Sequence, residues 1–505
     1  MTILPAFAQP DEAAFTSALG SHNLVPVHRT ILADLDTPLT IFAKVCENSE
    51  HVFLFESMEG GEKWGRYSFI GFDPLITFES MGESCRIGYP GMPTLQPVEK
   101  KGNPLTVLRE LMQSFSVAEP EGLPRFYGGA VGYLGYDMVR FVEKLPDRHP
   151  RQDMPDSALF IPRVLLIHDQ LKQRLTIVCT VWNAGQAAPS ALYAEACARI
   201  ETVSAQLRGP VPPAFAQQTP QAPGSRATHS FVSNTEAQAF KDMVVRAKEY
   251  ILAGDIIQVV LSQRFEAKAH IRPFSLYRAL RHVNPSPYLF CLRQNGSTLI
   301  GSSPEILVRL EDGQIEVRPI AGTRVRGRGP QEDLALEEEL LADPKERAEH
   351  LMLVDLGRND VGRVAALGTV QVHDLLVVER YSHVMHLVSG VSGQLAPDKD
   401  QFDVFAACFP AGTVSGAPKI RAMEIIDELE SARRGPYAGA VGYFGFSGNM
   451  DFCITLRTCI HTGESLWVQA GAGIVADSDP HKEHEETINK SMALRKAVEL
   501  AEQGL

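Results

Sequence analysis

Two segments far apart in this chain carry nearly the same glycine-rich sequence, and this repeat is the strongest constraint on the fold. Tyr127–Tyr136 reads YGGAVGYLGY and Tyr437–Phe446 reads YAGAVGYFGF, so seven of the ten positions are identical. Glycine inside a strand lets a neighbouring backbone approach closely. The repeat favours a two-lobed, pseudo-symmetric fold; chance or a shared local turn is the alternative explanation for one such pair.

A change of composition divides the chain. Residues 209–230 (GPVPPAFAQQTPQAPGSRATHS) are rich in Pro, Gln, Ala and Ser and show neither helical nor strand periodicity, which is typical of a linker. At roughly 100–200 residues per domain, a chain of 505 residues is expected to hold two large lobes or three ordinary domains. We predict an N-terminal region at 1–208, a linker at 209–230 and a C-terminal region at 231–505.

The N-terminal region has the pattern of short strands separated by turns, flanked by two helices. Strands are expected at 51–57, 66–72 and 164–181, and helices near 104–115 and 188–207.

The C-terminal region alternates long amphipathic helices with strands. The spacing Ser233-x-x-Glu236 predicts a capping box at the start of a helix. The apolar face of this helix is expected to hold Phe240, Val244, Ala247 and Ile251. Gly254 should end it, and a strand is expected at 256–265. Both regions together indicate an α+β fold with large, mostly antiparallel sheets flanked by helices.

Composition excludes several classes of partner. The net charge of −13 argues against nucleic acid and against an anionic membrane surface, because both require a basic surface. No run of about 18 apolar residues and no signal peptide is found, so we expect a cytoplasmic protein. The eight cysteines are scattered without a CxxC pair, and we expect them to be reduced and mostly buried in the core.

One predicted helix, at 344–356, places a carboxylate on an apolar face. Asp343 is its expected N-cap, with Pro344 in the first turn and Glu346 completing a capping box. Glu349 then shares a face with Met352, Leu353 and Leu356. A carboxylate in such a place is costly unless it is paired, protonated or bound to a metal. Pairing with an Arg or a His is the simpler explanation from spacing alone.

The last predicted helix, at 483–502, has the same feature. Glu486 and Lys490 are i,i+4 neighbours on a face that continues through Ala493, Leu494 and Ala497. A surface salt bridge is one interpretation. The other is a metal carboxylate beside a substrate-binding ammonium. Two carboxylates completed by waters and substrate oxygens suit Mg²⁺, and no His/Cys cluster indicates zinc.

Three loops of small residues could receive an anion. They are Gly412–Lys419 before a helix expected to begin near Pro418, Gly471–Gly473 after a strand, and Ile320–Thr323 after another strand. None matches a phosphate loop or a dinucleotide-binding motif. His386 lies on the apolar face of a strand-like run at 382–389, where a histidine is more often structural than catalytic. Glu305 follows a turn-like run, where a glutamate is usually solvated.

Together these segments resemble the chorismate-utilising enzymes and, among them, the large component of anthranilate synthase. The matching segments are Ser302–Glu305, Pro319–Thr323, Glu349–Asp355, Arg358–Asp360, Tyr381–Leu387, Gly412–Lys419, Tyr437–Tyr443, Gly471–Gly473 and Glu486–Lys490. This resemblance runs from about Phe240 to the C-terminus. The N-terminal region matches more loosely, through Phe55–Ser57 and Arg66–Gly71.

The resemblance implies a lyase that makes anthranilate, pyruvate and water from chorismate and ammonia at the start of tryptophan biosynthesis. It implies that Glu349 and Glu486 hold Mg²⁺, which would bind the ring carboxylate of chorismate. The catalytic candidates are Glu305 as general acid on the 4-hydroxyl, His386 as base at C2, and Thr413. The substrate-binding candidates are Gly322, Thr323, Tyr437, Arg457, Gly471, Ala472, Gly473 and Lys490.

The resemblance also implies feedback inhibition by tryptophan. The candidate regulatory residues are Glu56, Ser57, Pro287, Tyr288, Leu289, Tyr443 and Cys453. The family often has Leu where this chain has Phe55 and Met where it has Leu289. These apolar substitutions are expected to change the affinity for tryptophan more than the existence of the site.

Ammonia from glutamine must come from a second protein. A glutaminase needs a nucleophilic cysteine on a sharp turn usually flanked by Gly, and none of the eight cysteines has a neighbouring Gly. We therefore expect a separate glutamine amidotransferase small subunit and a hetero-oligomer.

Two positions separate this reaction from those of related chorismate enzymes. Relatives that add water at C2 resemble this chain but have lysine where it has Gln258, and relatives that aminate C4 have lysine where it has Ala321. Neither residue can supply the base or the nucleophile that lysine supplies. Amination at C2 is therefore expected. The rivals are aminodeoxychorismate, isochorismate or salicylate synthesis, or a non-catalytic tryptophan sensor on the same fold.

Overall fold

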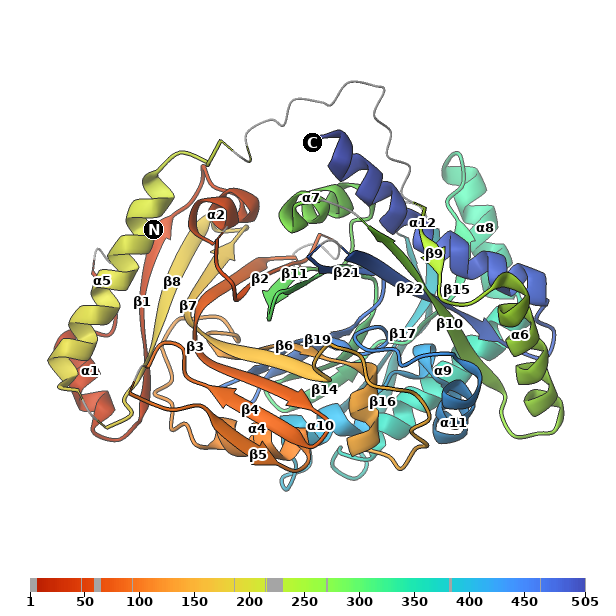
Figure 1. Cartoon of the computed structure of the whole chain (residues 1–505), viewed down its shortest axis with the longest axis horizontal. Coiled ribbons are helices and arrows are strands. Elements are labelled where there is room, and N and C mark those ends of the chain that lie inside the picture. Colours follow the sequence, from red (N-terminus) through yellow and green to blue (C-terminus); the bar gives the residue numbers. More distant parts are fainter. Residues whose placement is uncertain are drawn as a thin grey trace.

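The strands of this protein are joined in antiparallel pairs, and helices cover their outer faces (Figure 1). The computed structural model describes residues 7–46, 48–58, 65–92, 94–185, 187–213, 215, 230–268, 271–380, 384–463 and 465–504. In Figure 1 the N-terminal elements, red to yellow, lie on the left, and the C-terminal elements, green to blue, lie on the right. The predicted α+β class is confirmed.

The first eight strands belong to the N-terminal region. They are β1 (Leu24–Leu32), β2 (Val52–Glu56), β3 (Tyr67–Met81), β4 (Ser84–Gly88), β5 (Val98–Lys101), β6 (Gly129–Leu134), β7 (Ser157–Asp169) and β8 (Arg174–Trp182). The long strand β3 pairs with β2, β4 and β7, and β8 pairs with β7 and β1. The predicted strands at 51–57, 66–72 and 164–181 are present, the last as the hairpin β7–β8.

The remaining strands follow the linker. They are β9 (Val232–Ser233), β10 (Gln258–Lys268), β11 (Tyr288–Gln294), β12 (Ser297–Ser303), β13 (Ile306–Glu311), β14 (Gln314–Val317), β15 (Ile320–Val325), β16 (Gln371–Arg380), β17 (Val384–Gln394), β18 (Gly416–Ala417), β19 (Ala440–Gly445), β20 (Met450–Ile454), β21 (Thr458–Thr462) and β22 (Ser465–Ile474). Strand β10 pairs with β22 and β18, whereas β17 pairs with β14, β15 and β16. Strand β11 pairs with β2, so the two regions share a ladder.

The two copies of the glycine-rich repeat pair with each other. Strands β6 and β19 run antiparallel, and Gly132 faces Gly442, its own counterpart in the repeat. A local two-fold axis therefore passes between these glycines. A Cβ at Gly132 would lie 2.1 Å from the carbonyl oxygen of Ala158, and one at Gly442 would lie 2.0 Å from that of Asp451. Close backbone approach explains the glycine at each position.

Eleven α-helices and two short 3₁₀ turns surround the strands in the described part of the chain. The α-helices are α1 (Glu12–Leu19), α2 (Pro38–Val45), α4 (Pro104–Gln113), α5 (Pro189–Arg208), α6 (Ala237–Leu252), α7 (Pro273–Val283), α8 (Pro330–Ala342), α9 (Pro344–Gly362), α10 (Gln401–Cys408), α11 (Lys419–Leu429) and α12 (Pro480–Gln503), and the 3₁₀ turns are η1 (Tyr136–Phe141) and η2 (Gly412–Val414). Helix α12 packs against α7, α6 and β22, beside the site described below (Figure 1). None of the described helices is long and apolar enough to span a bilayer.

Two predicted capping boxes do not form. Glu236, not Ser233, is the N-cap of α6, and it makes no side-chain cap; Ser233 is held in β9, opposite Phe265 of β10. In α9, Asp343 is the N-cap as expected and accepts hydrogen bonds from the backbone N–H groups of Lys345 and Glu346. The Glu346 side chain instead accepts a hydrogen bond from Arg324 at 3.1 Å. Tertiary pairing overrides the local pattern in both cases.

One hydrophobic core draws residues from both sides of the linker. It packs Leu134 and Leu159 of the N-terminal region with Phe240, Phe405 and other residues of the C-terminal region. The cysteines are free, and all but Cys197 are buried, as expected. Most of the predicted linker, at 214 and 216–229, lies outside the described residues, so the division at 1–208, 209–230 and 231–505 stays a prediction.

Candidate active site

The first part of the candidate site lies where α9 passes the sheet edge formed by β10 and β22. Glu349 of α9 accepts a hydrogen bond at 3.2 Å from Nε2 of Gln258, the first residue of β10. The Gln258 amide lies over Gly473 of β22, where a Cβ would approach its Nε2 within 2.6 Å. Three residues predicted separately therefore lie together, and Gly473 is small because the amide occupies that space.

The last helix brings a second carboxylate and an ammonium to the same place. Glu486 and Lys490 form an ion pair at 2.7 Å, and about half of each side chain is exposed. Lys490 also donates to the carbonyl oxygen of Gly471 at 3.1 Å. The simple surface pair expected as an alternative is thus present, and the same lysine also reaches Gly471. The predictions of loops at Gly471–Gly473 and Ile320–Thr323 are wrong, because ladder pairing places these residues in β22 and β15.

Electrostatics link α9 and α12. Burial raises the pKa of Glu349, and the charges of Glu346 and Glu486 raise it further, against the hydrogen bond from Gln258. Burial also raises the pKa of Glu483, with Glu486 adding to it. Glu346 and Glu483 were not among the predicted site residues. The available signal was the repeated spacing Glu-x-x-Glu, which puts both carboxylates of each helix on one face.

These carboxylates suit an oxygen-preferring cation that is completed by other ligands. Within the described ranges, no three His, Cys, Asp or Glu side chains are already arranged around a common metal position. A divalent cation would nevertheless favour the charged forms of Glu349 and Glu483, whose pKa values are raised by burial and by neighbouring carboxylates. The remaining ligands would be waters and substrate oxygens, which Mg²⁺ commonly keeps. The residues present therefore fit this ion.

A buried carboxyl group lies on the other side of the site. Glu305 occupies the turn between β12 and β13 and is 8% exposed. Burial raises its pKa to about 8, against the hydroxyl of Thr413 and the positive charges of Arg457 and Lys490, which lower it. Glu305 is therefore mainly protonated at neutral pH and can donate a proton. The expectation that a glutamate after this turn would be solvated is wrong.

His386 is oriented by the backbone of β15. Its Nδ1 lies 3.1 Å from the carbonyl oxygen of Gly322 and 3.0 Å from Oγ1 of Thr323. A bond to a carbonyl requires the proton on Nδ1, so the lone pair lies on Nε2. Burial, together with the charge of Arg457, lowers the pKa of His386, while the bond to Gly322 opposes this. A neutral imidazole with a basic Nε2 can accept a proton. Residues 381–383 of the matching segment lie outside the described residues.

Arg457 and Lys490 connect these groups into one site. Arg457 is close enough to affect the pKa values of both Glu305 and His386. Lys490 affects Glu305 and contacts Gly471 and Glu486. The hydroxyl of Tyr437 lies over Gly471, where a Cβ would approach it within 2.7 Å. Ala472 is fully buried in β22. Ala321 of β15 pairs with Leu387 of β17, the residue that follows His386.

A separate cavity brings together all seven predicted regulatory residues. It is lined by Glu56, Ser57, Pro287, Tyr288, Leu289, Tyr443 and Cys453, together with Phe55, Tyr67, Phe69, Arg125, Arg309 and Asp451, among others. Arg309 pairs with Asp451 at 2.9 Å, and the hydroxyl of Tyr288 donates to Asp451, also at 2.9 Å. Phe55, Tyr67 and Phe69 lie in segments whose sequence resembles the family, whereas the charged lining residues Arg125, Arg309 and Asp451 were not predicted.

Comparisons with known proteins identify the family of this chain. Residues 50–496 match the family model described as chorismate binding enzyme. The chain is 48% identical to anthranilate synthase component 1 of Acetivibrio thermocellus over 95% of this chain and 96% of that protein. It is also 48% identical to the protein of that name from Aquifex aeolicus, over 96% of each.

Solved structures give the same result. Component I of anthranilate synthase from Streptococcus pneumoniae superposes with a TM-score of 0.73 at 36% identity, covering 87% of this chain and 95% of that one. The menaquinone-specific isochorismate synthase of Escherichia coli has the same fold, with a TM-score of 0.69 at 20% identity over 96% of this chain and 99% of that one. This chain therefore belongs to the chorismate-binding enzyme family, with the proteins named anthranilate synthase component 1 among its relatives.

Proposed function

We propose that this protein is the chorismate-using large subunit of an anthranilate synthase, which converts chorismate and ammonia to anthranilate, pyruvate and water. The observation that carries the proposal is the pairing of a protonated acid, Glu305, with a neutral base, His386, around one arginine, Arg457. The reaction needs both: a proton for the departing 4-hydroxyl and a base for a C–H bond. The names of the relatives support the same activity.

In this proposal the positive and small residues hold chorismate. Lys490 and Arg457 provide positive charge for its carboxylates, and Gly471 and Gly473 let the Tyr437 hydroxyl and the Gln258 amide lie directly against β22. Glu349 and Glu486 would hold Mg²⁺ with help from Glu346 and Glu483. The ion would neutralise the ring carboxylate and so favour attack by the nucleophile on the adjacent carbon.

The chemistry then proceeds in two stages. Ammonia attacks C2, the ring double bonds shift, and the C4–O bond breaks as Glu305 protonates the hydroxyl, which leaves as water. Nε2 of His386 next takes the proton from C2, the C3–O bond breaks, and the enolpyruvyl group leaves, taking up a proton to become pyruvate. Positioned acids and bases of this kind contribute about 10²–10⁴-fold each.

Gln258 and Ala321 explain in this proposal why ammonia attacks and why it attacks C2. The Gln258 amide cannot take up a proton, and it is already engaged with Glu349. Water therefore has no activating base there, whereas ammonia needs only to be positioned. Ala321 offers no nucleophile that could occupy C2. Gln258→Lys is expected to divert part of the flux from anthranilate to isochorismate.

The direct test is product analysis with the purified chain. Chorismate, MgCl₂ and ammonium should give anthranilate, followed by its fluorescence, and little isochorismate or salicylate should form without ammonium. The main product 4-amino-4-deoxychorismate, or abundant isochorismate from the unmodified chain, would overturn the proposal. A non-catalytic tryptophan sensor would form no product at all.

A separate glutamine amidotransferase subunit is proposed as the physiological source of ammonia. The word "component" in the names of the relatives supports a second polypeptide. Seven of the cysteines are buried, and burial raises the pKa of thiols such as Cys85 to about 11, so they are poor nucleophiles. The chain alone should not use glutamine; robust turnover with glutamine as the sole nitrogen source would refute this.

Tryptophan is the proposed inhibitor, and the aromatic-lined cavity is its proposed site. The cavity combines apolar walls for an indole ring with the charges of Arg125 and Asp451 for an amino-acid backbone. Tryptophan would favour a state that binds chorismate poorly, and the antagonism in binding must then be reciprocal. Addition of tryptophan should raise the Kd for chorismate, and chorismate should raise the Kd for tryptophan by the same factor.

A further inference from the structure

An arginine outside the candidate active site is fully enclosed behind it. Arg434 is 1% exposed and follows the end of α11. Its Nη1 donates to the carbonyl oxygen of Val414 at 2.7 Å, and its Nη2 donates to that of Val260, also at 2.7 Å. One guanidinium therefore bridges the 3₁₀ turn η2 and strand β10, which are far apart in sequence.

The carboxylate of Glu430 holds this guanidinium from the other side. Its Oε2 accepts from Nε of Arg434 at 2.9 Å, and its Oε1 accepts from Nη2 at 2.6 Å, so the pair is bidentate. Oε1 also accepts from the backbone N–H and the hydroxyl of Ser262, each at 2.8 Å. Gln469 of β22 in turn donates to the Ser262 hydroxyl at 2.9 Å.

Every segment that is hydrogen-bonded to this pair carries a residue of the candidate site, although the Arg434 guanidinium also lies 4.7 Å from the ring centre of Tyr136 in η1, outside that site. Val414 follows Thr413, Val260 lies two residues beyond Gln258 on β10, and Gln469 lies two residues before Gly471 on β22. The guanidinium carbon of Arg434 also lies 5.6 Å from the ring centre of Tyr437, whose hydroxyl covers Gly471. The pair thus contacts four segments that carry residues of the candidate site.

We propose that Arg434, held by Glu430, is a positioning residue that fixes the spacing between Thr413, the start of β10 and Tyr437 around chorismate. This inference rests on the proposed function for the identity of the substrate. An arginine suits the task because its planar group offers five N–H donors in fixed directions, which a lysine cannot reproduce. A buried ion pair is weak evidence for stability, so a gain in geometric order is the better reason for its presence.

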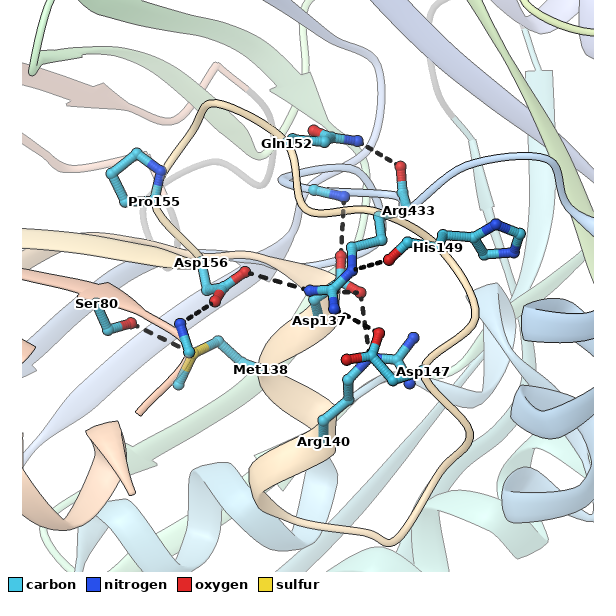
Figure 2. Close-up of polar contacts among 12 residues, drawn as sticks. Ser80, Asp137, Met138, Arg140, Asp147, His149, Gln152, Pro155, Asp156 and Arg433 are labelled. Carbon is cyan, nitrogen blue, oxygen red and sulfur yellow. Dashed lines mark hydrogen bonds and ion pairs between the residues drawn. The ribbon is translucent and has the colours of Figure 1, made fainter. Parts of the chain in front are cut away.

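The neighbouring arginine provides a matched control (Figure 2). Arg433 is 7% exposed and is also surrounded by carboxylates, Asp137, Asp147 and Asp156, and it donates to the carbonyl oxygen of His149 at 3.1 Å. These partners lie between the start of η1 and β7, in the N-terminal region, and none belongs to the candidate site. The two arginines therefore share burial and ion pairing but differ in what they hold in place.

The test compares Arg434→Lys with Arg433→Lys in the full-length chain. Both variants should unfold at lower denaturant concentration than the parent, because each loses hydrogen bonds of a buried arginine. Only Arg434→Lys should raise KM for chorismate and lower kcat, with kcat/KM reduced at least tenfold beyond that of Arg433→Lys. Equal kcat/KM values in the two variants would overturn the proposal.

Two further measurements test the positioning role if Arg434→Lys does not fold or if the proposed function is wrong. If Arg434→Lys does not fold, Ser262→Ala removes one contact of Glu430 without leaving a buried charge and should raise KM by a smaller factor; an unchanged KM would contradict the proposal. The affinity for chorismate, measured by calorimetry, separates the proposed function from the proposed positioning role of Arg434. If the parent binds chorismate but makes no anthranilate, the proposed function fails, and the ratio of Kd values between Arg434→Lys and Arg433→Lys still tests the positioning role.

Discussion

The candidate active site and the aromatic-lined cavity are built in different ways although they are close in the chain: β13, which carries Arg309 of the cavity, directly follows Glu305. In the active site, ionisable groups such as Glu349 and Glu305 are buried with little compensation, so their pKa values rise. In the cavity, the charged groups are paired: Asp451 with Arg309, and Glu56 with Arg281 at 3.3 Å and with the hydroxyl of Tyr277 at 2.5 Å. A site that moves protons needs groups poised to change charge, whereas a binding cavity needs a fixed shape.

The two sites are also physically continuous. Cys453 lines the cavity, and the backbone N–H of the next residue, Ile454, donates to the carbonyl oxygen of Glu305 at 3.0 Å. The hydroxyl of Ser303 donates to the carbonyl oxygen of Ile454 at 2.6 Å. A ligand in the cavity that displaced β20 would therefore act on the backbone that carries Glu305.

The largest effect is expected from the carboxylates that are proposed to hold Mg²⁺. Glu349→Gln and Glu486→Gln should each lower kcat/KM by at least about 10²-fold, because loss of a charged ligand weakens both the ion and the transition state. The tryptophan affinity of both variants, measured by calorimetry, should remain that of the parent. Turnover near that of the parent with unchanged dependence on Mg²⁺ in either variant would refute the assignment.

The next largest effect should appear in the pH dependence of kcat/KM. With Glu305 as general acid and a pKa of about 8, kcat/KM measured at a constant concentration of free ammonia should fall as pH rises through 8. Glu305→Gln should lower activity at every pH and abolish this fall. A profile of the parent that is flat from pH 7 to 9 would contradict the role.

The pH dependence of the unfolding free energy provides an independent measure of the protonation of Glu305. The native carboxyl holds its proton more tightly than the unfolded one, whose pKa is near 4.5, so the unfolding free energy should fall as pH rises from 4.5 to 8. The limiting slope is about 1.4 kcal/mol per pH unit. Glu305→Gln removes this slope, so it should gain stability relative to the parent above pH 8 and lose that advantage near pH 4. Parallel stability curves would show that Glu305 is not protonated in the native state.

A substitution in the cavity should change the inhibition by tryptophan strongly and the catalytic rate only slightly. Ser57→Phe should fill the space lined by Ser57 and relieve tryptophan inhibition by about tenfold or more, while kcat changes less than twofold. Initial rates at increasing tryptophan concentration measure this directly. Equal sensitivity of variant and parent would place the effector elsewhere.

Local patterns in the sequence were sufficient to predict the elements that carry the site. The N-cap Asp343, the carboxylate Glu349 on an apolar face, and the helix beginning after Pro418 all depend on residues within a few positions of one another. Periodicity and capping act over that range. The seven cavity residues came from a family resemblance, and the structure places them around one cavity.

Features that depend on contacts across the chain could not be predicted. The pairing of β6 with β19 and the bridge from Arg434 to Val260 and Val414 join residues that are far apart in sequence. The predicted capping box at Ser233 was wrong for the same reason, because pairing of β9 with β10 determines the position of that residue. The protonated state of Glu305 depends on burial, which the turn-like sequence around it does not indicate.

The smallest effect should come from the cavity wall at Leu289, where the family resemblance leads us to expect methionine. Leu289 is 1% exposed and pairs with Glu56 across the β11–β2 ladder. Leucine and methionine have similar volumes, and such exchanges usually cost less than about 1.5 kcal/mol. Leu289→Met should therefore keep the fold and kcat and change the tryptophan concentration for half-maximal inhibition by less than about tenfold, since 1.4 kcal/mol is a tenfold change. Inhibition curves of parent and variant at one fixed chorismate concentration measure this shift. A loss of inhibition as large as that of Ser57→Phe would show that the cavity selects its ligand by the detailed shape of this wall, and a lowered kcat would show that the wall also serves the active site.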